Sequence, residues 1–322
     1  MLRRRRLPAL AALLAAPALA RAETWPARPV TVIVPWAAGG GADTVTRILA
    51  QGLEQELKQP VNIVNRTGGN GITGHAAIAN AAPDGYTIGT GTSEFVNFRA
   101  LGLSEFGPAN LDLLSRVATL PAGVTVQAGA PWRDVGAFAA ALREAKRGQF
   151  TGSGVGAGGS WHLAAAGLCR ALGLPADQIR WIPSVGGAPA LQDLVAGGIT
   201  VFTGSPVEAQ SLVAAGRVRV LGVMAESRMS ILPEVPTLRE AGLPWTYANW
   251  FSLVAPRGIP AGVRTRLLDV CARAHARADV QEMLRGRGIV PVWDGPEAFA
   301  AFVGEFGQTS AVLLKELGLG RG

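Results

Sequence analysis

The stretch "VIVPWAAGGGADTVTRILA", residues 32–50, decides the fold. An apolar run with a strand pattern ends at Pro35-Trp36, three glycines follow, and an amphipathic helical pattern begins near Asp43. A glycine-rich turn between a strand and a helix exposes backbone N–H groups beside the positive end of the helix dipole. The loop lacks a lysine and the spacing of a phosphate loop, so any anion held there would meet neutral donors.

The same alternation of short β-branched runs and helical patterns continues from Trp25 onward, which predicts parallel α/β units. The expected strands cover residues 30–34, 61–65, a run inside "PDGYTIGTG" (83–91), 150–153, 179–183, 200–203 and 218–224. The expected helices cover residues 72–81, a segment from 160, a segment from 188, and 207–215. A proline-rich segment, residues 232–255, reads as irregular, and helical patterns follow it to the end.

The length of 322 residues suits two domains rather than one. We expect domain 1 to comprise residues 23–124 and 224–322, and domain 2 to comprise residues 125–223. The chain would pass between them near Thr125–Ala128 and again near Gly222–Ala225. Ligands of open α/β sheets bind at the carboxyl ends of the strands, so both domains would direct loops toward one cleft.

The first 22 residues read "MLRRRRLPALAALLAAPALARA" and have the three regions of a secretory signal peptide. Five of the 30 basic residues and none of the 23 acidic ones fall in this segment, which leaves 25 basic against 23 acidic residues. The formal net charge of +7 therefore gives no argument for binding nucleic acid. We expect an exported, periplasmic protein; the arginine run is compatible with either the general or the twin-arginine route.

The chain has two cysteines, Cys169 and Cys271, which could form one disulfide after export. Both lie in apolar helical patterns, "LAAAGLCRALG" and "RLLDVCARAHA". That context favours two buried free thiols.

Motifs for catalysis are weak. The three histidines, His75, His162 and His275, are far apart in the sequence and no two of them form an i,i+4 pair, so we expect no metal site. The sequence has neither a Gly-x-Ser-x-Gly elbow nor a phosphate loop. We therefore expect no enzyme activity and no cofactor.

The segment "FTGSGVGAGGSWHL", residues 150–163, formally matches a dinucleotide fingerprint between a strand and a helix. That function needs an acidic residue at the end of the next strand to hold a ribose hydroxyl. The next strand ends in Pro183, Ser184 and Val185, and the nearest acid, Asp177, precedes it. A dinucleotide site is not favoured.

Four loops after predicted strands share one character: they are rich in Gly, Ser, Thr and Ala and nearly free of charge. They are "PWAAGGGAD" (35–43), "GTGTSEF" (89–95), "GSGVGAGGS" (152–160) and "PSVGGAPA" (183–190). Their amides and hydroxyls, with nearby helix starts, would form a site for a small anion, especially a carboxylate.

Single polar and aromatic residues in these loops have structural explanations too. We interpret Asp43 as the N-cap of a helix that starts at Thr44, rather than as a ligand contact. Trp36, between a proline and the glycines, is favoured as a wall of the cleft. Trp161 and His162 could simply pack at the start of their helix.

Five motifs together resemble the substrate-binding proteins of tripartite tricarboxylate transporters, the Bug family. They are "WPARPVTVIVPWAAGGGADTVTRILA" (25–50), "VNIVNRTGGNGITG" (61–74), "AAPDGYTIGTGTS" (81–93), "GGAPALQDLVAGGI" (186–199) and "LPEVPTLREAGLP" (232–244). The resemblance implies a type II periplasmic-binding fold, with two α/β domains closing around a ligand cleft. It also implies capture of a small carboxylate, no catalysis, and transporter subunits or a sensor as partners; we expect a monomer.

The resemblance assigns ligand-binding positions residue by residue. In the first lobe they are Trp36, Ala37, Ala38 and Gly39, with Thr92 and Ser93 after the third strand. In the second lobe they are Ser153, Gly154, Ser160, His162, Gly187 and Ala188, together with Ser184 and Thr203.

The chain departs from the pattern of the family at two places. Thr203 stands where many relatives carry an aspartate, and Ser184 and Val185 stand where relatives often have Tyr and Lys or Arg. The far end of the pocket would be less charged and less bulky than usual. The identity of the carboxylate stays open, and an exported enzyme that uses the same glycine-rich cleft is the alternative function.

We predict cleavage after Ala22, because Ala20-Arg21-Ala22 fits the small-residue rule for signal peptidase. Sequencing of the exported protein should then begin at Glu23. An exported chain that begins at Met1 would contradict the prediction.

Overall fold

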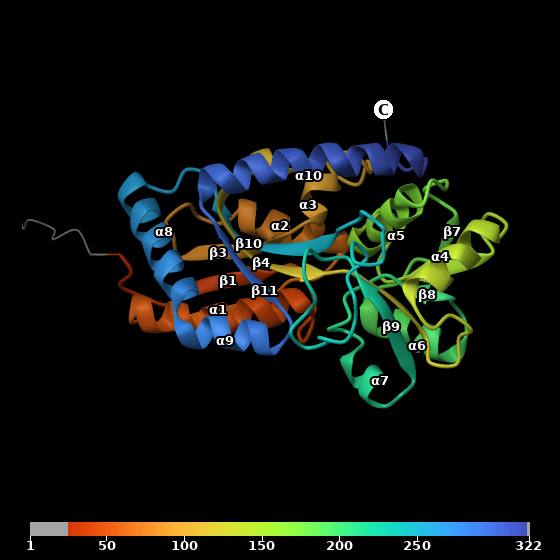
Figure 1. Cartoon of the computed structure of the whole chain (residues 1–322). Coiled ribbons are helices and arrows are strands. Elements are labelled where there is room, and N and C mark those ends of the chain that lie inside the picture. Colours follow the sequence, from red (N-terminus) through yellow and green to blue (C-terminus); the bar gives the residue numbers. More distant parts are fainter. Residues whose placement is uncertain (1–24, 321–322) are drawn as a thin grey trace, which may run out of the picture.

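The computed structural model describes residues 25–320, so the predicted signal peptide and Glu23 lie outside the described residues. Two β-sheets, each with helices packed around it, lie side by side (Figure 1). The strands are β1 (Val30–Val34), β2 (Val61–Asn65), β3 (Thr87–Thr92), β4 (Leu111–Pro121), β5 (Gly123–Gln127), β6 (Phe150–Ser153), β7 (Ile179–Trp181), β8 (Val201–Phe202), β9 (Val218–Val223), β10 (Ala248–Pro256) and β11 (Val290–Asp294). The helices are α1 (Gly41–Leu57), α2 (Ile72–Ala79), α3 (Glu94–Asn97), α4 (Val135–Glu144), α5 (Ser160–Ala171), α6 (Gly187–Ala196), α7 (Gln210–Ala214), α8 (Ala261–Ala276), α9 (Ala278–Gly286) and α10 (Pro296–Glu316), with short 3-10 turns at Gly69–Gly71 and Pro108–Asn110.

The first sheet has the strand order β11-β4-β10-β3-β1-β2. The strand β1 runs parallel to β2 and β3, with Val30 opposite Val61 and Thr31 opposite Thr87. The strand β10 runs antiparallel between β3 and β4. Because β1 and β3 are parallel neighbours, the turns that follow them emerge at the same edge of the sheet.

The second sheet has the order β7-β6-β8-β5-β9. The strand β6 is parallel to β7 and β8, whereas β5 is antiparallel to both β8 and β9. The loops that precede α5 and α6 therefore also emerge together, in agreement with the rule for parallel strands.

Three segments meet where the sheets adjoin. The Met224 amide donates to the Ala122 carbonyl (2.8 Å), the Ala122 amide donates to the Tyr247 carbonyl (2.9 Å), and the Tyr247 amide donates to the Met224 carbonyl (2.9 Å). Residues 224–247 remain attached to the second sheet, because Val223 bridges to Thr237 before the chain enters β10.

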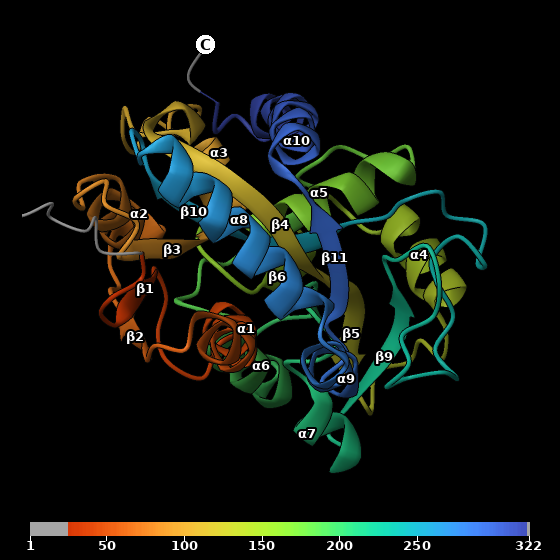
Figure 2. The same ribbon diagram turned by 90° about the vertical axis from the view of Figure 1, so that its left-hand side faces the viewer.

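The long helix α10 lies on the outside of the molecule and contacts both lobes (Figures 1 and 2). It packs on β4 and α3 in the first lobe and on α5 in the second. Its apolar side chains Phe299 and Leu314 are fully buried. No helix within residues 25–320 combines the length and the apolar character needed to cross a membrane.

Several predicted elements are confirmed to the residue: the strands 30–34, 61–65 and 150–153 and the start of α5 at Ser160. The prediction that residues 232–255 are irregular is wrong for its last part, because β10 begins at Ala248. Prolines upstream hid this strand, although its residues Trp250, Phe251 and Leu253 are buried and apolar. The predicted domain boundaries stay a prediction.

Both cysteines are free and buried, as the helical context predicted. Burial raises the pKa of the Cys169 and Cys271 thiols to about 12, so little nucleophilic thiolate exists near neutral pH. We predict no reaction of the native protein with a thiol reagent at pH 8. After denaturation without reductant, both thiols should react. Titration of a single thiol, or of none, in the denatured chain would contradict this expectation.

Candidate ligand-binding site

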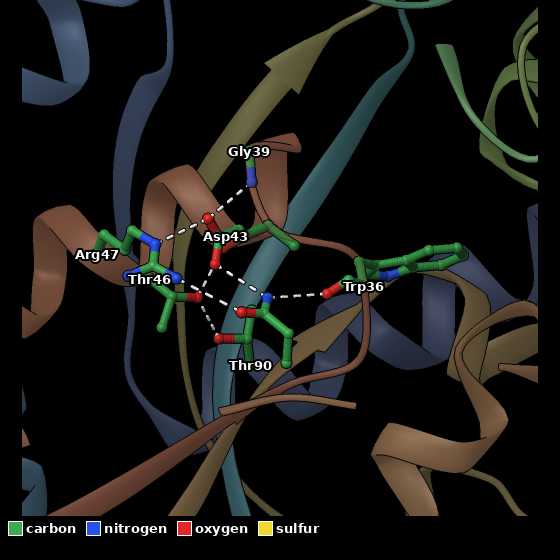
Figure 3. A network of polar contacts seen from close by, with 8 residues as sticks. Trp36, Gly39, Asp43, Thr46, Arg47 and Thr90 are labelled. Atoms are coloured by element: carbon green, nitrogen blue, oxygen red, sulfur yellow. Dashed lines mark hydrogen bonds and ion pairs between the residues drawn. The ribbon is translucent and has the colours of Figure 1, made fainter. Parts of the chain in front are cut away.

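The turn between β1 and α1 is held by one buried carboxylate. Asp43 is 2% exposed, and its Oδ2 accepts from the Gly39 amide and from Arg47 Nε, both at 2.8 Å. Its Oδ1 accepts from Asn65 Nδ2 at 3.0 Å. Figure 3 shows how these groups surround the carboxylate from the turn and from the next helical turn. Gly39 has φ of +85°, a conformation that favours glycine.

The prediction that Asp43 is an N-cap is wrong. The helix begins at Gly41 with Gly40 as the N-cap, so Asp43 is the third helical residue. Its carboxylate reaches back to the amide before the cap, much as the acidic member of a capping box does. Gly40 and Gly41 are typical of a loop in the sequence, so the sequence did not indicate that the helix begins at Gly41.

The charge of Asp43 is satisfied within the protein. Burial alone raises the pKa of this carboxyl, but hydrogen bonds from Arg47, the Gly39 amide and Asn65 outweigh burial and hold its pKa below the usual value. Asp43 therefore stays ionised at neutral pH and faces its own donors. It supports the turn rather than offering a contact to a ligand.

Asn65 and Thr46 extend this support into the sheet. Asn65, at the end of β2, also donates from Nδ2 to the Trp36 carbonyl at 2.9 Å. Thr46 donates to the Ala42 carbonyl at 2.6 Å and lies 2.5 Å from the hydroxyl of Thr90 on β3. The turn is thus fixed from three strands of the first sheet.

Trp36 and Thr92 are brought together as predicted. Trp36 donates from Nε1 to Thr92 Oγ1 at 3.1 Å, and the Thr92 amide donates to His75 Nε2 at 3.3 Å. His75 lies 2.8 Å from the Gly71 carbonyl through Nδ1, so that nitrogen carries the proton. Burial lowers the pKa of His75 to about 4, which keeps the ring neutral. The ring ties residues 68–71 to the end of β3.

A second buried cluster joins the two lobes. The hydroxyls of Ser93 and Ser160 lie 2.5 Å apart, although the residues belong to different sheets' loops. Ser160 contacts Glu94 Oε1 at 3.0 Å, and Ser93 contacts Asn249 Oδ1 at 2.7 Å. Two hydroxyl protons thus serve three close oxygen–oxygen contacts. Glu94 is 4% exposed, and its Oε2 has no partner within residues 25–320.

In the second lobe, the predicted residues line the starts of α5 and α6. Ser153 is fully buried, and its hydroxyl finds no partner in the described part of the chain. Gly154 lies against Trp161, where a Cβ would come within 2.8 Å of the indole. Gly187 and Ala188 begin α6, and the Ser184 hydroxyl donates to the Gly186 carbonyl at 3.0 Å.

The side chain of Thr203 makes a hydrogen bond to the start of α5. It is fully buried, and its hydroxyl donates to the Trp161 carbonyl at 2.8 Å. Its proton is therefore already used. Thr203 thereby fixes the first turn of α5, and its predicted contact with a ligand stays a prediction.

His162 also lies apart from the group around Trp36. Its Nδ1 accepts from the Gly158 amide at 3.0 Å, and its ring stacks on Trp181 at 4.7 Å between centroids. The ring borders a separate hollow with Arg147 and Asp177. Burial lowers the pKa of His162 to about 4, so this ring is neutral.

Two acidic residues near the site escaped the sequence analysis. One is Glu94; the other is Glu208, whose Oε2 would lie 2.4 Å from a Cβ placed on Gly187. Burial raises the pKa of Glu208 to about 7. Glu94 lies within the loop 89–95 and Glu208 lies close in space to the loop 183–190, but neither has a local motif that marks it.

We predict that Asp43→Asn lowers the free energy of unfolding by about 1–3 kcal/mol at pH 7, because an amide nitrogen would face other donors in a buried position. The folded pKa of Asp43 is lowered, so its contribution is present above about pH 4 and is lost as pH falls through the folded pKa. Urea unfolding at pH 7 and pH 3 should therefore show a difference from wild type that shrinks in acid.

The matched control is Asp269→Asn, which removes an exposed pair with Arg273 at the same i,i+4 spacing as Asp43 and Arg47. Its loss should stay within about 0.5 kcal/mol. Equal losses in the two variants would contradict a special role for Asp43.

Comparison with known proteins agrees with this geometry. Residues 45–319 match the model of the tripartite tricarboxylate transporter family receptor. A UPF0065 protein from the tcbD-tcbE intergenic region of Pseudomonas sp. (strain P51) is 34% identical over 284 residues, covering 87% of this chain and 83% of the relative.

Two solved structures have the same fold at 28% identity. One is R. palustris Rpa4515 with adipate, with a TM-score of 0.82 over 91% of this chain and 98% of the other. The other is MatC from Rhodopseudomonas palustris with bound malate, with a TM-score of 0.77 over 90% and 100% of the chains. The type II binding-protein fold expected from the sequence is confirmed. The chain belongs to the receptor family of tripartite tricarboxylate transporters.

Proposed function

We propose that this protein captures a small carboxylate outside the cytoplasm and delivers it to the membrane subunits of a tripartite transporter, or to a sensor. The single observation that carries the proposal is the state of the β1–α1 turn. Ala37 and Ala38 are exposed there, and within residues 25–320 their amides donate to no acceptor. Free N–H groups on a rigid turn before a helix start are suited to a carboxylate.

The electrostatics of the turn support the same conclusion. Asp43 is next to the free amides, but its charge is compensated by Arg47 and by two further hydrogen bonds, from the Gly39 amide and from Asn65. An incoming carboxylate therefore meets donors rather than an uncompensated like charge. The two similar structures contain malate and adipate, which are dicarboxylates, and this supports a ligand of comparable size.

The proposed mode of capture is closure of the two lobes about the junction at Ala122, Met224 and Tyr247. Contacts such as Ser93 to Ser160 already join the lobes in this structure and would break when the lobes open. The protein would bind its ligand without changing it: His75, the buried histidine next to the turn, is neutral and already engaged in hydrogen bonds.

A thermal-shift screen with malate, adipate and the neutral diamide of succinic acid tests the ligand class. The dicarboxylates should raise the melting temperature, because binding to the folded state stabilises it by mass action, and the diamide should not. A protein that no carboxylate stabilises would contradict the proposed class of ligand.

The variant Ala38→Pro tests the place of binding, because proline has no amide N–H. We expect it to raise the dissociation constant of the carboxylate found in the screen by at least tenfold, which is about 1.4 kcal/mol of binding free energy. Calorimetry measures this change. Ala38→Ser keeps the amide and should bind within about threefold of wild type. If the proline variant binds normally, the carboxylate lies elsewhere, even though the class of ligand stands.

A further inference from the structure

A second cavity, of about 700 Å³, lies beside the junction of the lobes. Its lining comes from β4, β10, β11, α10 and the end of α9 and from the segment that follows β9, and it includes none of the predicted ligand-binding residues. Figure 2 shows β11 and α10 next to this segment. Its volume is within the range of about 300–1,000 Å³ that small-molecule sites occupy.

Five aromatic side chains form a continuous wall of this cavity. Trp245 stacks on Tyr247 (5.9 Å between centroids), and Tyr247 contacts Phe306 at 6.3 Å. Phe306 contacts Phe302 at 6.0 Å, and Trp250 lies 5.6 Å from each of those two rings. Aromatic surfaces of this extent attract flat apolar rings through offset and edge-to-face contacts.

The charges at the cavity do not select a strongly charged ligand. Arg116 pairs with Asp294 at 2.6 Å and covers the Phe302 ring at 3.7 Å. The other cations among the lining residues are Arg228 and Arg285, and the anions are Glu226 and Glu305; Arg228 and Glu226 are paired with Glu240 and Arg239. The remaining two charges, at Arg285 and Glu305, are of opposite sign.

Adaptable and polar groups complete the lining. Met224 and Met229 are buried thioethers that fit irregular shapes. The indole Nε1 of Trp250, a residue that is 1% exposed, has no partner among the described residues. A site with apolar walls and few polar groups is the usual composition of a small-molecule pocket.

The cavity also draws its walls from both lobes. Trp245 is fixed on α5, because its Nε1 donates to the Ala164 carbonyl at 3.2 Å and its ring lies directly over Gly167. Phe302 and Phe306 belong to α10, which packs on the first sheet. We propose that this cavity binds a compact, flat, apolar ring compound, separately from the carboxylate turn.

The test uses the full exported chain labelled with 5-fluorotryptophan, and 2-naphthol and 2-naphthoate as neutral and anionic probes. The eight tryptophan resonances are assigned by single Trp→Phe changes. 2-Naphthol should shift the resonances of Trp245 and Trp250 and leave Trp36 unchanged, and malate or adipate should not displace it.

Thr309→Phe places a larger side chain on α10 inside the cavity and should lower the affinity for 2-naphthol by at least tenfold. The neighbouring residue Gln308 is exposed on the same helix but does not line the cavity, so Gln308→Phe should leave binding within about twofold. Ala225→Phe fills the cavity from the segment that follows β9 and should lower the affinity as Thr309→Phe does. Agreement between the two variants shows that the loss does not come from a local folding defect in one of them.

Three results would overturn the proposal. One is the absence of 2-naphthol binding; another is unchanged binding in both narrowing variants. The third is binding of 2-naphthoate alone with displacement by dicarboxylates, since that pattern belongs to the carboxylate turn. Failure of the carboxylate function would not affect the 2-naphthol measurement, because that measurement requires no dicarboxylate to bind.

Discussion

The rest of the molecule depends on the small set of backbone hydrogen bonds that joins Ala122, Met224 and Tyr247. These bonds hold three chain segments together where the two sheets adjoin. They fix how the loops after β1 and β3 face the loops after β6 and β7. They also fix Tyr247, whose ring contacts α10 through Phe306. Both the carboxylate turn and the aromatic cavity therefore inherit their geometry from one junction.

An anion site made of neutral donors needs an internal source of rigidity, because amides cannot attract an anion as strongly as a cation can. At the proposed site in this protein, the rigidity comes from a buried acid. The Asp43 carboxylate accepts hydrogen bonds from the Gly39 amide, Arg47 and Asn65. Asn65 also donates to the Trp36 carbonyl. The turn is thereby held in shape before a ligand arrives, so little ordering entropy opposes binding. The negative charge of Asp43 is compensated by Arg47, so it adds little repulsion for a carboxylate ligand.

Local patterns in the sequence were enough to predict the strands 30–34, 61–65 and 150–153, because β-branched runs bounded by Gly and Pro have few other structures available. They also predicted the four uncharged loops. They did not predict which polar groups would be consumed internally. Thr203 bonds to Trp161, and Ser93 meets Ser160 and Asn249, which are 67 and 156 residues away in the chain. Such pairs depend on how the sheets are placed, and no local pattern contains that information. The strand β10 was missed for a different reason: the prolines upstream of it are typical of irregular structure.

The two proposed sites share the moving parts of the protein. If the lobes close over a carboxylate, Trp245 moves with α5, and α10, which carries Phe302 and Phe306, must adjust because it packs on both α5 and the first sheet. The aromatic wall would then change shape at the contact between Tyr247 and Phe306. A compound that fits the wall in only one arrangement must favour that arrangement, and by linkage the carboxylate must change the affinity of the cavity by the same factor. A compound that fits both arrangements equally would bind without any influence on the carboxylate, however tightly it is held. The coupling between the sites is therefore decided by how far closure displaces Trp245 from α10, and not by the affinity of either ligand.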